Sequence, residues 1–137
     1  LQAFQKSIPV TVHIAFGTDT IHNHPLSNGG SLGKGTEIDF RIFTHEVSHL
    51  DKGGVFINVG SAVLLPEVFL KAVSAIRNSG QELSQFTTAN FDFMQHYRPT
   101  KNVLQRPVKG HGRGFAITGH HELTIPLLAA ILLRKIR

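Results

Sequence analysis

The run Val55-Phe56-Ile57-Asn58-Val59 is almost wholly apolar and ends in the small-residue turn Gly60-Ser61. A short apolar run of this kind is typical of a strand that is buried on both faces of a parallel sheet. Pro66 and Glu67 suit the first turn of a helix that follows it, and Gly80 suits the end of that helix. The stretch therefore predicts one strand–helix unit of an α/β protein.

Similar units are predicted on both sides of this one. Further strands are expected at 9–16, around 84–89 and at 114–118, and a final helix is expected from about Glu122 toward Arg134. Another helix is expected to start at Thr36, with Asp39 as its capping-box partner, and to stop at Gly53-Gly54. This alternation predicts a single α/β domain over residues 1–137, with a Rossmann-like parallel sheet and helices on both faces.

Composition bounds the class of protein. The 137 residues are 41% hydrophobic and 17% charged, which is typical of a globular chain. The absence of cysteine excludes disulfides and thiolate metal sites. The longest apolar run, 125–133, is too short to span a membrane, and no signal peptide is expected, so we expect a cytoplasmic protein without membrane contact.

Charge is unevenly distributed along the chain. Residues 1–92 hold six Lys and Arg against eight Asp and Glu, a net charge of −2, whereas residues 93–137 hold eight against one, a net charge of +7. This basic excess is compatible with a phosphate-bearing small molecule or with nucleic acid. Few aromatic residues accompany it and no recognition motif is present, so a basic, non-catalytic nucleic-acid-binding module is a minor alternative.

Polar and titratable residues follow each predicted strand. In open parallel sheets, ligands bind beyond the carboxyl ends of the strands, so these residues are expected to line one site. The expected pocket residues are Asp19, His22, His24, Gly60, Ser61, Thr88, Ala89, Asp92, Gly119, His120 and Glu122. The turn after Val59 and the run 110–114, in which glycine alternates with cationic residues, are both suited to meeting a phosphate group.

Two groups of histidines raise the possibility of a metal site. His45-Glu46-Val47-Ser48-His49 has the spacing of a zinc-hydrolase helix, and Glu67 is a conceivable third ligand. The two histidines lie opposite the apolar stripe of their predicted helix, and Asp51-Lys52-Gly53-Gly54 ends that helix at once. The second group comprises His22, His24, His120 and His121. We expect His45 and His49 to face solvent or a partner chain, and the second group to form hydrogen bonds that line a pocket. A metal-dependent hydrolase is kept as the alternative.

The order of these segments resembles the C-terminal part of deoxyhypusine synthase and its bacterial relatives. The resemblance rests on Gly30-Ser31-Leu32-Gly33, on the strand 55–61, on Thr87-Thr88-Ala89 with Asp92 nearby, and on the spacing from Arg98-Pro99 through Gly119-His120 to 126–128. It covers most of this chain but less than half of a full family member. The resemblance implies a Rossmann-like fold, an NAD cofactor bound at the subunit interfaces of a homo-oligomer, and transfer of an aminobutyl group from spermidine.

The resemblance also implies roles for particular residues. Gly60, Ser61, Thr88, Ala89, Gly119 and His120 would bind the dinucleotide, and Asp92 would lie near the polyamine. Ungapped spacing places Pro107 where the family has its catalytic lysine, with Lys109 two residues away, and Lys101 at an acidic polyamine-binding position. We therefore expect an NAD-binding protein, with His120, Asp92 and Lys109 as candidate catalytic residues acting on a divergent substrate in a pocket that includes Asp19, His22, His24 and Glu122.

Overall fold

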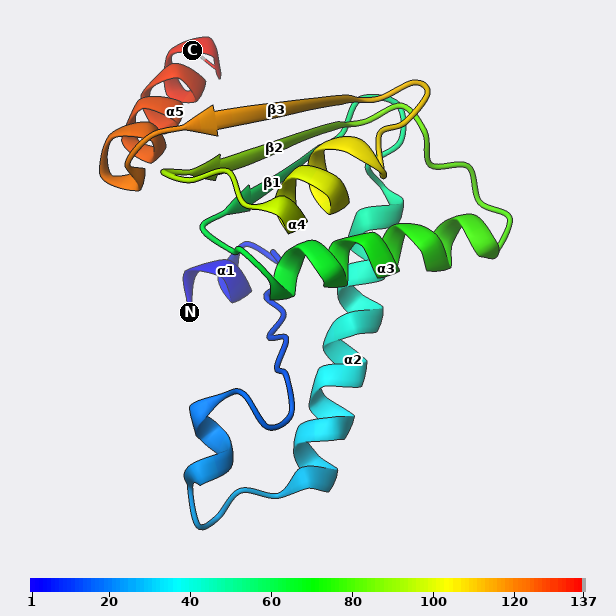
Figure 1. Cartoon of the computed structure of the whole chain (residues 1–137), viewed down its shortest axis with the longest axis vertical. Coiled ribbons are helices and arrows are strands. Elements are labelled where there is room, and N and C mark those ends of the chain that lie inside the picture. Colours follow the sequence, from blue (N-terminus) through cyan, green and yellow to red (C-terminus); the bar gives the residue numbers. More distant parts are fainter. Residues whose placement is uncertain (137) are drawn as a thin grey trace.

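The computed structural model describes residues 1–136 (Figure 1). The elements in chain order are α1 (Gln2–Gln5), the 3₁₀ turn η1 (Thr20–Asn23), α2 (Gly29–Ser48), β1 (Val55–Val59), α3 (Leu64–Asn78), β2 (Thr87–Asp92), α4 (Tyr97–Pro99), the π-helical segment η2 (Thr100–Gln105), β3 (Arg113–Thr118) and α5 (His121–Ile136). The chain is therefore an α/β protein. Among these residues no helix has the length and hydropathy needed to cross a membrane.

The three strands form an open, parallel sheet in the order β1-β2-β3. Ile57 pairs with Ala89, which in turn pairs with Phe115, so these three side chains lie on the same face. Phe56, Thr88 and Gly114 form the next row and belong to the other face. All carboxyl ends consequently lie along one edge of the sheet, as parallel pairing requires.

The core lies between one face of the sheet and the helices α2, α3 and η2. Phe56 of β1 stacks on Phe69 of α3 with ring centroids 3.7 Å apart, and Phe86 meets Phe69 edge to face. Phe69 is fully buried, as are Ala72 and Val73 one turn further along α3. This spacing of three and four places the apolar stripe of α3 on the sheet.

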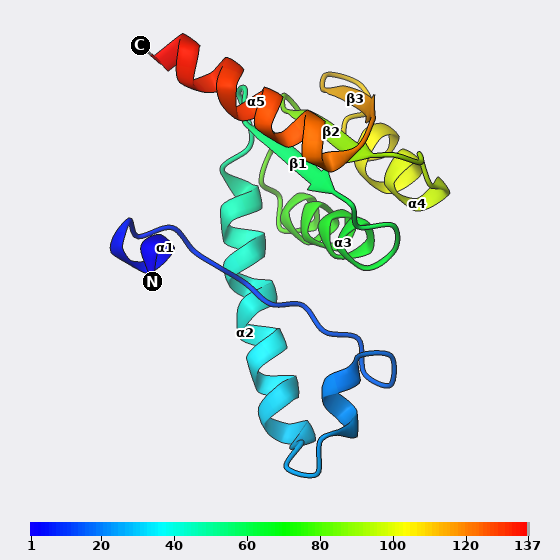
Figure 2. The ribbon, with the colours of Figure 1, turned by 90° about the vertical axis from the view of Figure 1, so that its left-hand side faces the viewer.

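The second face of the sheet is largely open in the part of the chain that the structure describes. Val55, Ile57 and Phe115 on this face remain 56%, 40% and 48% exposed. Figure 2 shows α3 and α4 on one side of the sheet and α5 on the other, where α5 contacts β2 with its first turns and then leads away. Helices therefore cover one face of the sheet, as expected, whereas α5 covers only part of the other face.

Chain topology explains this asymmetry. Both connections between neighbouring strands run in the same direction, from β1 to β2 and from β2 to β3. Parallel crossovers are right-handed almost without exception, so two successive crossovers in one direction place their helices on the same face. α3 and η2 accordingly contact one another.

The predicted strand at 9–16 is wrong. This segment is extended but pairs with no strand, and it crosses α2 as a separate arm (Figure 2). The amide of Val12 donates to a carboxylate oxygen of Asp39 at 2.9 Å, so a side chain of α2 replaces a neighbouring strand. His13 packs edge to face on Phe43 of the same helix. Alternating residues therefore cover a helix here rather than extend the sheet.

The predicted start of the long helix at Thr36 is also wrong. α2 begins at Gly29, where the side chain of Asn28 accepts a hydrogen bond from the Ser31 amide at 2.8 Å. Four glycines between residues 29 and 35 made this first part look like a loop, because glycine has a low helix propensity. Asp39 does not act as a capping partner, since it binds the arm.

The other strands are confirmed with small shifts in their bounds. β1 spans the predicted residues, and β3 begins one residue early. β2 covers 87–92 rather than 84–89, because the amides of Ser84 and Gln85 donate to the carboxylate of Asp51 instead of to a neighbouring strand. α3 and α5 agree with the predicted helices in type and approximate extent.

Candidate functional site

Two glycine turns flank the carboxyl end of β2. The amide of Gly60, after β1, donates to the carbonyl of Phe91 at 3.0 Å. The amide of Gly119, after β3, donates to the carbonyl of Asp92 at 3.1 Å. These bonds extend the sheet by one step beyond the strands on each side. Predicted site residues from three separate segments are thereby brought to one edge.

His121 fixes the conformation of this edge. Its Nε2 lies 3.0 Å from the carbonyl oxygen of Phe91, and its ring lies 3.2 Å from the point that a Cβ atom on Gly60 would occupy. Gly60 also has a φ of +66°, a value that favours glycine. The turn after β1 therefore closes tightly against the first residue of α5.

A chain of amide side chains lies just inside the edge. Asn58 of β1 donates to Asn90 of β2 at 2.6 Å, and Asn90 donates to Gln95 at 2.8 Å. Gln95 in turn donates to the hydroxyl of Thr118 on β3 at 3.2 Å. Asn58 and Asn90 are buried, so the network ties together all three strand ends. Sequence reasoning missed Asn58 and Gln95 as parts of this edge.

Two helices begin at the same edge. α3 starts at Leu64, and the hydroxyl of Ser61 accepts a hydrogen bond from the Leu65 amide at 3.1 Å. α5 starts at His121, directly after Gly119 and His120. The free amide groups and the dipole at a helix N-terminus favour an anionic group. A cavity of about 290 Å³ adjoins the start of α3, lined by Ala62, Val63, His96, Tyr97 and Arg98.

Asp92 and His120 occupy different environments. Asp92 is 3% exposed, and its carboxylate accepts a long 3.4 Å hydrogen bond from the Met94 amide. His120 is exposed and lies parallel to the ring of Phe93, with centroids 6.3 Å apart. Glu122 is exposed in the first turn of α5. Asp92, His120 and Glu122 thus lie near one edge, as expected from the sequence.

Thr88 and Ala89 lie further back along β2 and point to opposite faces of the sheet. Thr88 is fully buried, and its hydroxyl donates to the carbonyl of Val103 at 2.8 Å. Ala89 is half-buried on the open face. Thr88 thus joins β2 to η2 behind the edge, whereas Gly60, Ser61, Gly119 and His120 lie at the edge itself.

Three predicted pocket residues lie far from this edge. Asp19, His22 and His24 belong to the N-terminal arm, at the opposite end of the molecule from the sheet (Figure 1). Asp19 accepts a hydrogen bond from the Ala15 amide at 2.6 Å, and His22 stacks on Phe16. Because 9–16 is not a strand of the sheet, the expectation that these residues join His120 is wrong. The metal group of His22, His24, His120 and His121 is likewise not assembled.

Lys109 lies at the opposite edge of the sheet. It precedes β3, whereas His120 follows that strand, and a six-residue strand separates the two edges by about 20 Å. Lys109 therefore does not share a site with Asp92 and His120. Pro107 is buried, and its carbonyl accepts a hydrogen bond from Arg77.

The zinc-hydrolase spacing does bring its residues together. Ligand atoms of His45, Glu46 and His49 all lie within 4.8 Å of one another, and all three side chains are exposed. The predicted orientation away from the core is confirmed, because Val47 of the same helix is buried. Glu67 is not a third ligand, since it accepts a hydrogen bond from Asn102 at 2.7 Å and pairs with Arg98 at 3.2 Å.

Comparisons with known proteins returned no family model, no curated protein and no solved structure that matches this chain.

Proposed function

We propose that this chain is a nucleotide-binding domain of the deoxyhypusine-synthase-like kind, with a Rossmann-like fold, that holds NAD or a related nucleotide at the carboxyl edge of its sheet. The observation that carries this proposal is the pairing of two glycine turns on either side of the β2 end. The amide of Gly60 donates to the carbonyl of Phe91, and that of Gly119 donates to the carbonyl of Asp92, the last two residues of that strand. Helices α3 and α5 begin at these turns, which is where an α/β sheet offers amide groups to phosphates.

The chain's own residues suggest how such a ligand would be held. The turn at Gly60 and Ser61 offers backbone atoms without bulky side chains. The guanidinium of Arg98, beside the cavity at the start of α3, is positioned by Glu67 but remains half-exposed. His120 is accessible at the end of β3 and offers an imidazole that can donate or accept a hydrogen bond. A bound nicotinamide would supply hydride acceptance there.

The proposal does not include transfer through Lys109. That lysine lies at the other edge of the sheet, and Pro107 occupies the place of the family's lysine. The groups available for acid–base work at the proposed site are Asp92 and His120. We therefore propose that the site binds this ligand and that any reaction there uses a divergent substrate.

We also propose that a second copy of the chain covers the open face. Several large apolar side chains are exposed on that face and along α5, and a stable dimer buries roughly 800 Å² on each partner. These side chains include Ile57, Val59, Phe115, Leu127 and Ile131. Light scattering at several concentrations tests this, and a chain that stays monomeric at high concentration would contradict it.

The test of ligand binding is calorimetric titration with NAD and, separately, with ADP. We expect saturable binding that weakens about tenfold in His120→Ala, because a contact to a charged or strongly polar group contributes about 1.4 kcal/mol. His24→Ala is the matched control, since His24 lies on the distant arm. Absence of saturable binding to either ligand, or equal weakening in both variants, would overturn the proposal.

A second candidate function is favoured by one observation, the assembled His45, Glu46 and His49 group. We propose that this group binds zinc. Elemental analysis of the native protein is then expected to find stoichiometric metal that is lost in His45→Ala. His111→Ala serves as the control, because it removes an exposed histidine outside that group. A native protein that retains no metal would contradict this proposal, and the two histidines would then be solvent-facing residues at a helix end.

A further inference from the structure

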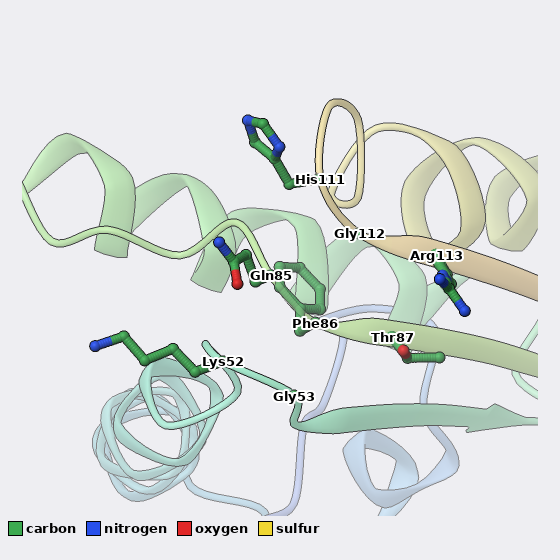
Figure 3. A pocket seen from close by; sticks show the side chains of 8 residues that line it. All are labelled: Lys52, Gly53, Gln85, Phe86, Thr87, His111, Gly112 and Arg113. Carbon is green, nitrogen blue, oxygen red and sulfur yellow. The ribbon is translucent and has the colours of Figure 1, made fainter.

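The amino edge of the sheet, opposite the proposed nucleotide site, contains a cavity with a basic lining. The cavity has a volume of about 470 Å³ and lies where the turn before β1 meets the starts of β2 and β3. Lys52, His111 and Arg113 contribute the titratable side chains of its wall, and Phe86 forms part of the floor (Figure 3). No acidic residue lines it.

Within residues 1–136, the cationic groups of this cavity take part in no ion pair. The two ion pairs in that range join Arg41 to Glu37 and Arg98 to Glu67, so neither Lys52 nor Arg113 is neutralised by one. The neighbouring carboxylate of Asp51 accepts hydrogen bonds from the amides of Ser84 and Gln85 at 2.8 and 2.9 Å, and the charge of Lys52 acts on it without forming an ion pair. Positively charged side chains that line one hollow create a positive potential that favours an anion.

The wall of the cavity is built by backbone bonds between separate segments. Gly53 donates to the carbonyl of Gln85 at 2.8 Å, and Arg113 donates through its amide to the carbonyl of Phe86 at 3.1 Å. At Gly112 a Cβ atom would lie 2.6 Å from the carbonyl oxygen of Phe86, so only glycine permits this approach. The positions from which the cationic side chains extend are therefore fixed before any ligand arrives.

Lys52 adopts a backbone conformation that glycine would adopt more easily. Its φ is +63°, in the left-handed region, and its neighbour Gly53 has a φ of +114°. A residue with a Cβ atom is strained in that region, and strain of this kind is concentrated at functional positions. The fold thus holds a lysine at the rim where a glycine would be more stable.

We infer that the amino-edge cavity binds a small anion with several phosphate groups. Lys52 and Arg113 lie on opposite sides of Phe86, and His111 lies above it (Figure 3). An anion with adjoining phosphates can meet spread cations together, whereas a single small anion reaches fewer of them. Arginine binds phosphate oxygens in a fixed fork and lysine binds them as a point charge. The volume lies within the usual range for small-molecule sites.

The test uses inorganic triphosphate as the probe, titrated into the whole protein in about 0.15 M salt, where weak long-range attraction is screened. We expect saturable binding to one site that weakens about tenfold in Arg113→Gln and in Lys52→Gly. Lys71→Gln is the matched control, because it removes one exposed positive charge from α3, away from the cavity. The control is expected to bind like the native chain.

Lys52→Gly also separates loss of the ligand contact from loss of the fold. Because glycine relieves the left-handed strain, this variant is expected to melt at a higher temperature while binding triphosphate less tightly. Lack of saturable triphosphate binding would overturn the inference. So would equal weakening in Lys71→Gln, or binding that occurs only with duplex DNA and falls in all three variants, because either result would indicate general attraction by the basic surface.

Discussion

The covered face of the sheet carries several polar residues, whereas the exposed face carries mostly apolar ones. The covered face carries Asn58, Thr88, Asn90 and Asp92, all polar and all buried. The open face carries valine, isoleucine and phenylalanine, and Val55, Ile57, Val59 and Phe115 remain between 40% and 56% exposed. Phe91 on β2 is the exception at 7%, on the strand that α5 contacts. Burial therefore follows from chain topology and not from the hydrophobicity of each side chain.

The comparison also shows how polar residues are accommodated inside the fold. The side-chain amide of Asn58 donates a hydrogen bond to the side-chain oxygen of Asn90, and the hydroxyl of Thr88 donates to the carbonyl of Val103 in η2. Buried polar groups of this kind are tolerated when they are bonded. Of the apolar open face, only the part around Phe91 is buried within residues 1–136, and burying the rest against another surface would lower the free energy of the folded state.

The largest expected effect distinguishes the two faces directly. Phe69→Ala removes a fully buried ring from the covered side and is expected to lower the free energy of unfolding by about 3–5 kcal/mol. Ile57→Ala on the open face is expected to cost about 1 kcal/mol in the monomer, because much of that side chain is already in water. Urea unfolding measures both. A loss for Ile57→Ala that grows with protein concentration would show that a second copy buries this face.

The polar network of the covered face gives the second test. Asn90→Ala leaves an N–H of Asn58 and the side-chain oxygen of Gln95 without their partner, and is expected to lower stability by about 2 kcal/mol. Asn58→Ala removes the other side of the first bond. If the two residues act as a unit, the double variant should lose less than the two single losses together, and simple additivity would contradict a shared network.

The third test lies at the carboxyl edge, where both faces end. Gly60→Ala adds a Cβ atom to a residue with left-handed backbone and points it toward the ring of His121. We therefore expect the free energy of unfolding, measured by thermal unfolding, to fall by about 1–2 kcal/mol. Gly33→Ala in α2 is a suitable control, since no atom lies within 4 Å of its added methyl group. The control should be neutral or stabilising, because alanine favours a helix more than glycine does.

The smallest effect concerns the arm that covers α2. Partial burial lowers the pKa of His13 from its ordinary value of 6.5, while the charge of Asp39 opposes that shift. The unfolded chain therefore takes up the proton first, and the contribution of neutral His13 to stability is lost as pH falls below 6.5. Thermal unfolding between about pH 8 and about pH 5 should show less pH dependence in His13→Gln than in the native chain.

A matched control sharpens that measurement. The pKa of Asp51 is lowered by hydrogen bonds from the amides of Gln85 and Ser84, so its contribution is present above 3.8 and declines only at lower pH. Asp51→Asn should consequently leave the pH dependence of thermal stability between about pH 8 and about pH 5 unchanged. A similar change in both variants would argue against His13 as the source.

Local sequence patterns predicted site residues correctly only where those residues follow strands that pair in the sheet. Gly60 and Gly119 follow strands that pair with β2, so their convergence with Asp92 could be foreseen from the rule for parallel sheets. The prediction for Asp19, His22 and His24 failed because alternation in 9–16 is equally suited to covering a helix. Gln95 was missed because its role depends on Thr118 of another strand, which no local pattern indicates.

The sequence by itself determined the elements around Val55–Val59, the apolar stripe of α3 and the glycine turns that end two strands. These features depend on spacing, propensity and backbone freedom, which act over a few residues. Only the tertiary structure decided that the N-terminal arm stays outside the sheet, that one face is left open, and that Lys52 and Arg113 line one cavity at the amino edge. Those outcomes depend on the handedness of crossovers and on contacts between distant segments, which no local pattern encodes.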